Sequence, residues 1–440
     1  MTAPRSDVAF SGSVVRSVAH DPLVTGAEGR AANSTLRTTT QERRKLNILQ
    51  VCDHLGWEGS RMHGVKRLFA WMIPRFDPDR YNVSLVSLRR KDVSEETLES
   101  FGIDITYLHK SKFDPSTLPA LIKVIDRKAI DILHLHGYGA TTFGRLAGGF
   151  RRLPTIVHEH ANLTDTPWFQ KVADAMLEPL TDIAIAVSQS TADFVVKARQ
   201  LPPDKVKVVY LGVPLEEFSR PRSAEEVAAA RAALGLTADE FAVGTVTRLH
   251  ESKGNSYLVD AARVVIRERP KVKFFVVGEG PLLGELQEQA HALGITDRFI
   301  FGGFARDVAQ VLSGFDLSVF PSLWEGTPLT VFEALAMGKP IVATDADGLV
   351  DVLTDQHDAL IVPKRDASAL AAGILRMMDD GELRARLGAQ ARVTARQYDI
   401  AAFVAKMERL YELLHRVSRV THRRGAVESD LSFLTSKAGA

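Results

Sequence analysis

The 440-residue chain lacks the features that mark several large protein classes. Its single cysteine, Cys52, cannot form a disulfide within the chain, which fits a reducing compartment such as the cytoplasm. No apolar run approaches the roughly 20 residues of a transmembrane helix, and residues 1–21 lack the apolar core of a signal peptide. A formal net charge of +1 argues against binding nucleic acid through bulk charge. We therefore expect a cytoplasmic protein.

What is present is enough apolar material for more than one core. Hydrophobic residues make up 45% of the chain, and its length suggests two or three domains. Residues 1–44 are rich in Ser, Thr, Ala and Arg without sustained periodicity, so we expect a flexible extension there. Regular structure is expected from Leu46 onward.

Apolar runs of strand length alternate with helical spacing through residues 45–213. This alternation predicts a doubly wound α/β domain, which would bind its ligand at the carboxyl ends of the strands. The first glycine-bearing loop lacks the Gly-x-Gly-x-x-Gly spacing of a dinucleotide fold, which argues against a dehydrogenase. The expected strands are Leu46–Cys52, Tyr81–Leu88, Ile105–Leu108, Asp131–His136, Thr155–His160, Ile183–Ser188 and Val206–Val213.

The same alternation repeats after a proline-bearing linker at 214–222. Residues 223–397 therefore predict a second domain of the same architecture, although the two halves do not repeat one sequence. Its expected strands are Ala242–Arg248, Val272–Gly278, Phe299–Gly302, Leu317–Phe320, Pro340–Ala343 and Ala359–Val362.

One stretch, Phe320–Met337, carries the strongest functional signal. It predicts a buried strand end, then a loop with Glu325 and Gly326, and then a helix. We expect Thr327 to cap this helix and Pro328 to lie in its first turn. The free N–H groups of Leu329 and Thr330 at the helix start are typical of a phosphate site. Glu325 in front of the site and Glu333 behind it could each bind sugar hydroxyls.

The Glu325 to Glu333 spacing, followed by Gly338-Lys-Pro340, resembles the retaining glycosyltransferases of family 4. The resemblance implies the GT-B fold, with two Rossmann-like domains that face each other across a cleft. It also implies that Glu325 contacts the donor sugar, that Glu333 holds the ribose and that no metal is bound. A helix at residues 398–420 would cross back to the first domain, leaving a loose tail at 421–440.

Two cations follow the first strand of the second half, in the segment Thr247-Arg-Leu-His-Glu-Ser-Lys-Gly254. Arg248 and Lys253 could clamp a diphosphate and stabilise it as it departs. Their spacing matches the Arg-x4-Lys-Gly pattern of the family. Gly278 and Gly280 resemble the family's Gly-x-Gly-Pro turn beside the nucleotide, although an ordinary turn explains them almost as well. Gly303 is expected beside the base.

Histidines end two strands of the first half. His134 and His136 should point the same way, since side chains alternate along a strand. His136 resembles the family's histidine near the reacting sugar, and we expect His134 to be a packed core residue. His158 and His160 are acceptor-side candidates or structural residues. Glu159 should point away from both, which argues against a metal site within that segment.

The first loop and helix leave two further questions open. Gly59, His63 and Gly64 resemble the family's glycine loop, which approaches the donor phosphates or the acceptor. Lys66 and Arg67 with neighbouring aromatic residues could dock a helix on a membrane, but a helix with its apolar side in the core is the simpler explanation. Ser188 matches a common family position, and an N-cap is again the simpler explanation.

These patterns together predict a retaining glycosyltransferase that moves a sugar from a nucleoside-diphosphate sugar, such as a UDP- or GDP-sugar, to a hydroxyl acceptor. The acceptor would be a sugar, a lipid-linked molecule or a small molecule. No permanent cofactor, nucleic-acid partner or tightly held metal is expected, and a peripheral contact with the cytoplasmic membrane face stays possible. Two alternatives remain: a nucleotide-sugar-binding scaffold without activity, and a phosphorylase that uses phosphate.

Overall fold

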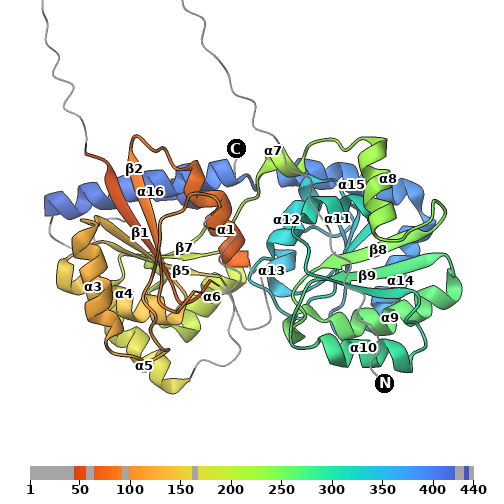
Figure 1. Ribbon diagram of the computed structural model, residues 1–440, viewed down its shortest axis with the longest axis horizontal. Coiled ribbons are helices and arrows are strands. Elements are labelled where there is room, and N and C mark those ends of the chain that lie inside the picture. Colours follow the sequence, from red (N-terminus) through yellow and green to blue (C-terminus); the bar gives the residue numbers. More distant parts are fainter. Residues whose placement is uncertain are drawn as a thin grey trace, which may run out of the picture.

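The computed structural model describes residues 44–55, 64–91, 98, 100–160, 167–421 and 431–435. Within this part the chain forms two α/β halves that lie side by side (Figure 1). Each half is built on one sheet in which every strand pairing is parallel. The predicted fold class of two doubly wound units is confirmed.

The first sheet has seven strands in the order β3-β2-β1-β4-β5-β6-β7. Its interior strand β1 is covered on both faces, because Ile48 lies in one apolar core and Leu49 in another. Such double burial explains why the strand is a continuous apolar run. The strands are β1 Leu46–Cys52, β2 Tyr81–Ser87, β3 Ile105–Tyr107, β4 Ile132–His136, β5 Thr155–Glu159, β6 Ile183–Ala186 and β7 Val206–Val208.

The second sheet has six strands in the order β10-β9-β8-β11-β12-β13. In both sheets the order reverses beside the first strand, at β1/β4 and at β8/β11, and ligands of open α/β sheets bind outside the carboxyl ends at such a point. The strands are β8 Phe241–Val246, β9 Val272–Val277, β10 Phe299–Gly303, β11 Leu317–Phe320, β12 Ile341–Thr344 and β13 Leu360–Val362.

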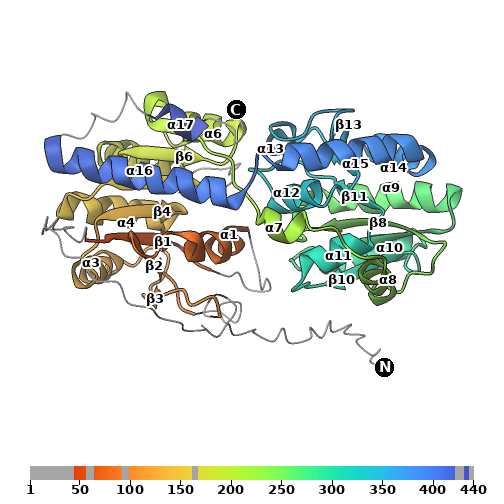
Figure 2. The ribbon, with the colours of Figure 1, turned by 90° about the horizontal axis from the view of Figure 1, so that it is seen from above.

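Helices cover both faces of each sheet (Figures 1 and 2). In the first half α3 and α4 contribute to one core, while α1 and α16 contribute to the other. The helices of the first half are α1 Gly64–Met72, α3 Thr117–Arg127, α4 Tyr138–Arg151, α5 Trp168–Leu177 and α6 Gln189–Ala198. The later helices are α7 Leu215–Phe218, α8 Ala224–Ala233, α9 Asn255–Glu268, α10 Leu283–Ala292, α11 Val308–Gly314, α12 Leu329–Ala336, α13 Asp347–Val350, α14 Ala367–Asp379, α15 Gly381–Ala395, α16 Ile400–Thr421 and α17 Ser432–Thr435.

The two segments that connect the halves meet at one hydrogen-bonded contact. Val213 N donates to Tyr398 O at 2.9 Å, and Ile400 N donates to Val213 O at 3.0 Å. From there α16 returns along the first half, where the buried Tyr411 lies in the core shared with α1 (Figure 2). The predicted returning helix is therefore confirmed.

One local prediction in the connecting region was wrong: the expected strand Val206–Val213 ends at Val208. The segment predicted as a linker contains the helical turn α7. Pro214 precedes α7, and its fixed φ suits the residue before a helical turn. The exact domain boundaries stay a prediction.

Helix α1 buries its apolar side chains. Phe69 is fully buried and Trp71 is nearly so in the core shared with α16, and Phe76, which follows the helix, is buried there too. The simpler explanation, a helix packed on the core, is therefore the correct one for this segment. Across the ranges described above, no helix is both long and apolar enough to cross a membrane.

Candidate active site

The loops that follow β8 and β11 lie against each other, because these two strands are neighbours in the second sheet. Leu323 N donates to Ser252 O at 2.8 Å. Gly254 has a φ of +60°, and a Cβ added there would lie 2.0 Å from Pro321 O. Only glycine allows both this backbone conformation and this close approach. The structure thus brings together the two segments that carry the predicted donor site.

Lys253 and Glu325 form a direct ion pair in this loop pair. Lys253 Nζ lies 2.5 Å from Glu325 Oε1 and 2.7 Å from Oε2. Ser322 Oγ donates to Oε1 of the same carboxylate at 2.8 Å. Both side chains are mostly buried, with exposed fractions of 16% for Lys253 and 8% for Glu325. The carboxylate is therefore fixed in one orientation.

Arg248 lies beside this pair but does not join it. Burial lowers the pKa of its guanidinium, while the charge of Glu325 acts in the opposite direction. Among the described residues the guanidinium has no hydrogen bond or ion pair. A partly buried cation without a partner is a ready site for an anionic group.

Glycines line the neighbouring strand ends. A Cβ at Gly278, whose φ is +148°, would lie 1.8 Å from Thr247 O, and one at Gly280 would lie 2.3 Å from Leu249 O. These glycines therefore let the turn after β9 pack on the backbone around Arg248. Gly303 also has a positive φ, of +63°, but a Cβ there would meet nothing within 4 Å.

Helix α12 begins one residue later than the sequence predicted. Pro328 is the N-cap residue, and Thr327 is not. The Thr327 hydroxyl instead donates to Gly326 O at 2.6 Å and to Val187 O of the first half at 3.3 Å. Val331 N donates to Pro328 O, so the backbone N–H groups of Leu329 and Thr330 are the ones left open at the helix start.

Glu333 lies inside α12 and is fully buried. Its carboxylate forms an ion pair with Arg67 of helix α1, which belongs to the other half. Burial raises the pKa of Glu333, and the Arg67 charge opposes that shift. Contact between Glu333 and a ribose therefore requires Arg67 to share the carboxylate or to move.

Other parts of the first half also reach the loop at Gly326. A Cβ at Gly326 would lie 2.3 Å from His160 O, and one at Gly64 would lie 3.9 Å from Leu329 Cδ1. Gln189 N donates to Asp351 Oδ2 at 2.8 Å. The halves thus meet around the predicted donor loop. The predicted loop residues Gly59 and His63 lie outside the described residues.

The histidines of β4 and β5 form one cluster, because His136 pairs in register with His158. His136 is 2% exposed, with Nδ1 2.8 Å from His160 Nε2 and Nε2 2.7 Å from Gln50 Oε1. Both ring nitrogens are thus occupied within the protein. His136 therefore has no free nitrogen for the donor sugar in this arrangement. Glu159 lies on the opposite face, paired with Arg199, as the strand alternation predicted.

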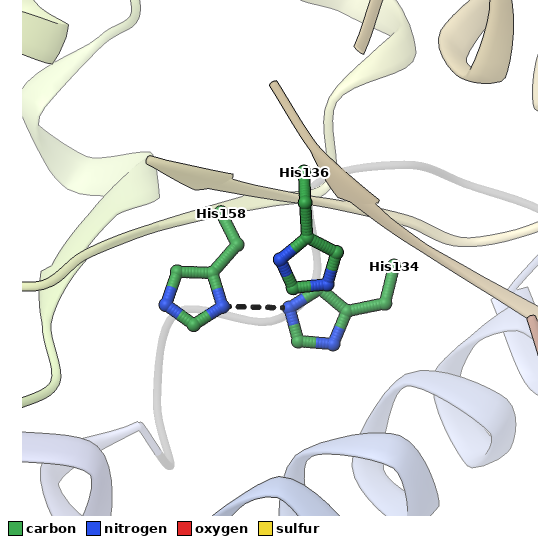
Figure 3. Close-up of side chains that lie close together, drawn as sticks. All are labelled: His134, His136 and His158. Carbon is green, nitrogen blue, oxygen red and sulfur yellow. Dashed lines mark hydrogen bonds between the residues drawn. The ribbon is translucent and has the colours of Figure 1, made fainter. Parts of the chain in front are cut away.

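The cluster as a whole was missed in the sequence because each strand was considered alone. His134 and His158 bond through Nε2 and Nδ1 at 3.1 Å (Figure 3). Burial lowers the pKa of His134 and of His160 to about 3, and it lowers the pKa values of His136 and His158 as well. Histidines at alternating positions in two consecutive strands were the available signal. Ser188 caps α6, accepting a hydrogen bond from Thr191 N at 3.1 Å.

Both halves of the chain match models of known glycosyltransferase families. Residues 62–217 match the model described as Glycosyltransferase Family 4, and residues 227–394 match the one described as Glycosyl transferases group 1. Together the two matches span most of both halves. The chain belongs to the family 4 glycosyltransferases. The predicted class of reaction, transfer of a sugar from a nucleotide-sugar donor, is thereby confirmed.

Curated relatives of this glycosyltransferase include enzymes of glycoconjugate synthesis. One is the Escherichia coli UDP-Gal:alpha-D-GlcNAc-diphosphoundecaprenol alpha-1,3-galactosyltransferase, 23% identical over 72% of this chain and 86% of its own length. Another is the lipopolysaccharide core biosynthesis glycosyltransferase LpsD of Rhizobium meliloti, 36% identical over 41% of this chain and 51% of LpsD.

Solved structures agree on the fold. The Anabaena protein HepE, crystallised with UDP and glucose, is 22% identical, with a TM-score of 0.72 over 83% of this chain and 99% of HepE. A glycosyltransferase from Rickettsia africae gives a TM-score of 0.73 at 17% identity, over 84% of this chain and 99% of its own. The predicted GT-B fold is confirmed.

Proposed function

We propose that this enzyme transfers a sugar from a UDP- or GDP-sugar to a hydroxyl acceptor with retention at the anomeric carbon. The observation that carries the proposal is Arg248, a partly buried cation with no partner in the described chain, beside the fixed Lys253–Glu325 pair. In this proposal the diphosphate binds Arg248 and the open N–H groups of Leu329 and Thr330. HepE, with its bound UDP, makes a uridine nucleotide the first donor to try.

The roles of the two glutamates differ. Glu325 would accept hydrogen bonds from donor-sugar hydroxyls through the carboxylate that Lys253 and Ser322 orient. Glu333 would bind the ribose once Arg67 shares its carboxylate. His136 would help position the residues around the sugar without contacting it, since its ring nitrogens already bind Gln50 and His160.

The retaining route would be attack from the side of the leaving group. The bond between C1 and the phosphate oxygen breaks, the bond between C1 and the acceptor oxygen forms, and the acceptor proton passes to the departing phosphate. Glu325 is a poor covalent nucleophile, because Lys253 lies within 2.7 Å of both its oxygens. A double displacement would also need a second carboxylate about 5 Å away. Arg248 and Lys253 would replace a metal at the diphosphate.

The test combines binding, stereochemistry and metal removal. Melting temperature should rise with one class of nucleoside diphosphate sugar in a panel of UDP-, GDP- and ADP-sugars. NMR of the product should show the anomeric configuration of the donor, and EDTA should leave the rate unchanged. Glu325→Ala should abolish transfer while UDP still binds. An inverted product, or full transfer by Glu325→Ala, would contradict the proposal. Binding without any turnover of the donor would instead support a scaffold.

We propose further that the enzyme docks on an anionic lipid surface through helix α5. This helix exposes apolar side chains and buries polar ones: Gln170 and Asp174 are buried, whereas Trp168 and Met176 are 76% and 75% exposed. Asp174 is held inward by ion pairs with Arg145 and Arg199. The rest of the exposed apolar face consists of Phe169, Val172 and the nearby Phe113, with Lys171 and Lys112 beside it.

A mixture of exposed aromatic side chains and lysines fits a membrane interface. The E. coli relative acts on an acceptor linked to diphosphoundecaprenol, which a membrane would present. Co-sedimentation with vesicles rich in phosphatidylglycerol should fall about tenfold for Trp168→Ser. Val172→Ser should also weaken it, whereas Val393→Ser should not, although these valines are equally exposed at 50% and 49%. Unchanged sedimentation of Trp168→Ser, or a dimer lost in that variant, would contradict lipid docking.

A further inference from the structure

Four imidazole rings at the ends of β4 and β5 pack together beneath helix α16, and those of His134, His136 and His158 are buried. Ring centroids lie 4.6 Å apart for His134 and His136, and 4.2 Å apart for His158 and His160. Figure 3 shows three of them on neighbouring strands, with α16 passing below. Because every ring is desolvated, all four are neutral, so each ring has one N–H donor and one bare nitrogen.

Gln50 decides which nitrogens carry hydrogen in the first pair of rings. Its Nε2 donates to the Tyr411 hydroxyl at 2.9 Å, which leaves Oε1 to accept from His136 Nε2 at 2.7 Å. His136 Nδ1 is then bare and accepts from His160 Nε2 at 2.8 Å. His160 must therefore carry its hydrogen on Nε2, and its Nδ1 is a bare acceptor.

Tyr411 decides the second pair in the same way. Its single hydroxyl hydrogen points to His134 Nδ1 at 2.8 Å, because within the described chain it has no other acceptor. His134 then carries hydrogen on Nε2 and donates to His158 Nδ1 at 3.1 Å. His158 must therefore carry its remaining hydrogen on Nε2.

Each chain of hydrogen bonds ends on an atom with nothing to bind. His158 Nε2 and His160 Nδ1 are both buried, and neither has a partner in the described part of the chain. One is a donor and the other an acceptor, on adjacent rings. A hydroxyl oxygen can accept from the first and donate to the second. Buried polar atoms in native proteins are nearly always satisfied, so this complementary pair points to a ligand.

We propose that His158 and His160 together bind one hydroxyl group, and that Gln50 and Tyr411 are positioning residues that fix its orientation. The His160 carbonyl lies against Gly326, so the pair adjoins the predicted donor loop. The hydroxyl belongs either to the acceptor sugar, an assignment that rests on the proposed function, or to a bound water. Helix α16 thus acts on the site through Tyr411 without contacting the substrate.

A metal ion is the rival occupant of this cluster. One nitrogen from each of His134, His136 and His158 lies within 4.8 Å of the others. Tetrahedral zinc with bonds of about 2.0–2.1 Å would need these atoms about 3.4 Å apart. Each bare nitrogen on these three rings already accepts a hydrogen bond from Tyr411, His160 or His134. The geometry therefore favours the hydroxyl over the metal.

The tautomers provide a test that needs no substrate. Long-range 1H–15N spectra of the labelled full-length chain should show hydrogen on Nε2 in His134, His136, His158 and His160. Tyr411→Phe removes only the hydroxyl, so His158 should then populate the form with hydrogen on Nδ1, while His160 stays unchanged. A purely structural tyrosine would leave the His158 signals as they were. Hydrogen on Nδ1 of His160 in the wild type would overturn the proposal.

The occupant is identified by high-resolution crystal structures of the full chain, without sugar and after soaking in N-acetylglucosamine. An oxygen within hydrogen-bond distance of both free nitrogens supports the proposal, and whether it is a water or a sugar hydroxyl identifies its source. The variants His160→Gln and His158→Asn each keep the bond to the neighbouring ring, and each should lose the oxygen. His291→Gln, on the exposed face of α10, is the matched control.

Two results would overturn the hydroxyl site: no oxygen between the two nitrogens, or about one zinc ion per chain by elemental analysis. Either result leaves the proposed sugar transfer intact, because that reaction is measured separately as release of UDP from a UDP-sugar. Failure of UDP release with correct tautomers and a bound oxygen would instead count against the proposed function alone.

Discussion

At the scale of single residues, the two predicted donor cations are in different states. Lys253 is neutralised by Glu325, whereas Arg248 lies beside the pair with its charge unbalanced. The pair orients the carboxylate, and in the proposed function the guanidinium of Arg248 would attract the anionic diphosphate. Lys253 therefore stabilises the protein without its ligand, and both cations would face the diphosphate in the proposed function.

This difference predicts opposite effects on stability. Lys253→Ala leaves a buried carboxylate without its partner and should lower the free energy of unfolding by about 3 kcal/mol. Arg248→Ala removes an unpaired, partly buried charge, so urea unfolding should change by less than about 1 kcal/mol. Both variants should bind UDP at least about tenfold more weakly by calorimetry. Equal loss of stability in the two variants would contradict this assignment.

Sequence alone placed Arg248, Lys253 and Glu325 in one site, because parallel strands bring their carboxyl ends to the same edge. It did not predict the Arg67–Glu333 ion pair, since that contact depends on how the two halves dock. It also assigned the cap of α12 to Thr327, whose hydroxyl instead donates to the carbonyls of Gly326 and of Val187 in the first half. Local pattern cannot reveal a competing partner from a distant segment.

At the scale of elements, β4 and β5 place a buried neutral cluster where most proteins carry apolar side chains. In the unfolded chain each histidine titrates near 6.5, whereas burial lowers the pKa of His134 and of His160 to about 3 in the fold. Between pH 3 and pH 6.5 the unfolded chain thus binds more protons than the folded chain. The histidines' contribution to stability is complete above pH 6.5 and is lost as the pH falls toward 3.

We therefore expect the melting temperature to decrease as the pH is lowered from 7.5 to 5.5. The loss is about 1.4 kcal/mol at pH 5.5 for each histidine whose folded pKa lies well below that pH. Replacing His134 by glutamine should reduce this slope, whereas replacing the exposed His291 should not. A melting temperature independent of pH over this range would show that the four rings are not held neutral.

Every strand of the structure falls within or beside a predicted strand, because buried parallel strands are continuous apolar runs. The helical spacing between the expected strands also predicted a helix at Phe169–Leu177, where α5 lies, but it did not predict which side of that helix faces the core. The spacing of its apolar residues predicts that they face the core. Ion pairs with Arg145 and Arg199 instead hold Asp174 on the buried side. Charges on other elements decided the orientation, and periodicity carries no information about them.

At the scale of the whole molecule, the contact between Gly326 and the His160 carbonyl sets how closely the halves approach. In Gly326→Ala the new Cβ would lie 2.3 Å from that carbonyl oxygen, so the halves must separate slightly. We expect UDP to bind about tenfold more weakly while each core stays folded, since the clash lies between the halves. Small-angle scattering and calorimetry measure the two effects.

Gly284→Ala is the matched control for this prediction. A Cβ at Gly284 in α10 would meet nothing within 4 Å, so the change should be neutral or stabilise the chain by up to about 1 kcal/mol. Wild-type UDP affinity in Gly326→Ala would show that the approach of the two halves does not limit binding.

The two crossings between the halves are tied together where Val213 bonds to Tyr398 and Ile400. Gly212 makes this possible, since a Cβ there would lie 2.4 Å from the backbone of Asp399. Because the two connecting segments are hydrogen-bonded to each other at one point, they form a single hinge between the halves. Any opening of the enzyme would then be a rotation of one half about that hinge. A single proteolytic cut in either connecting segment would leave the two halves associated.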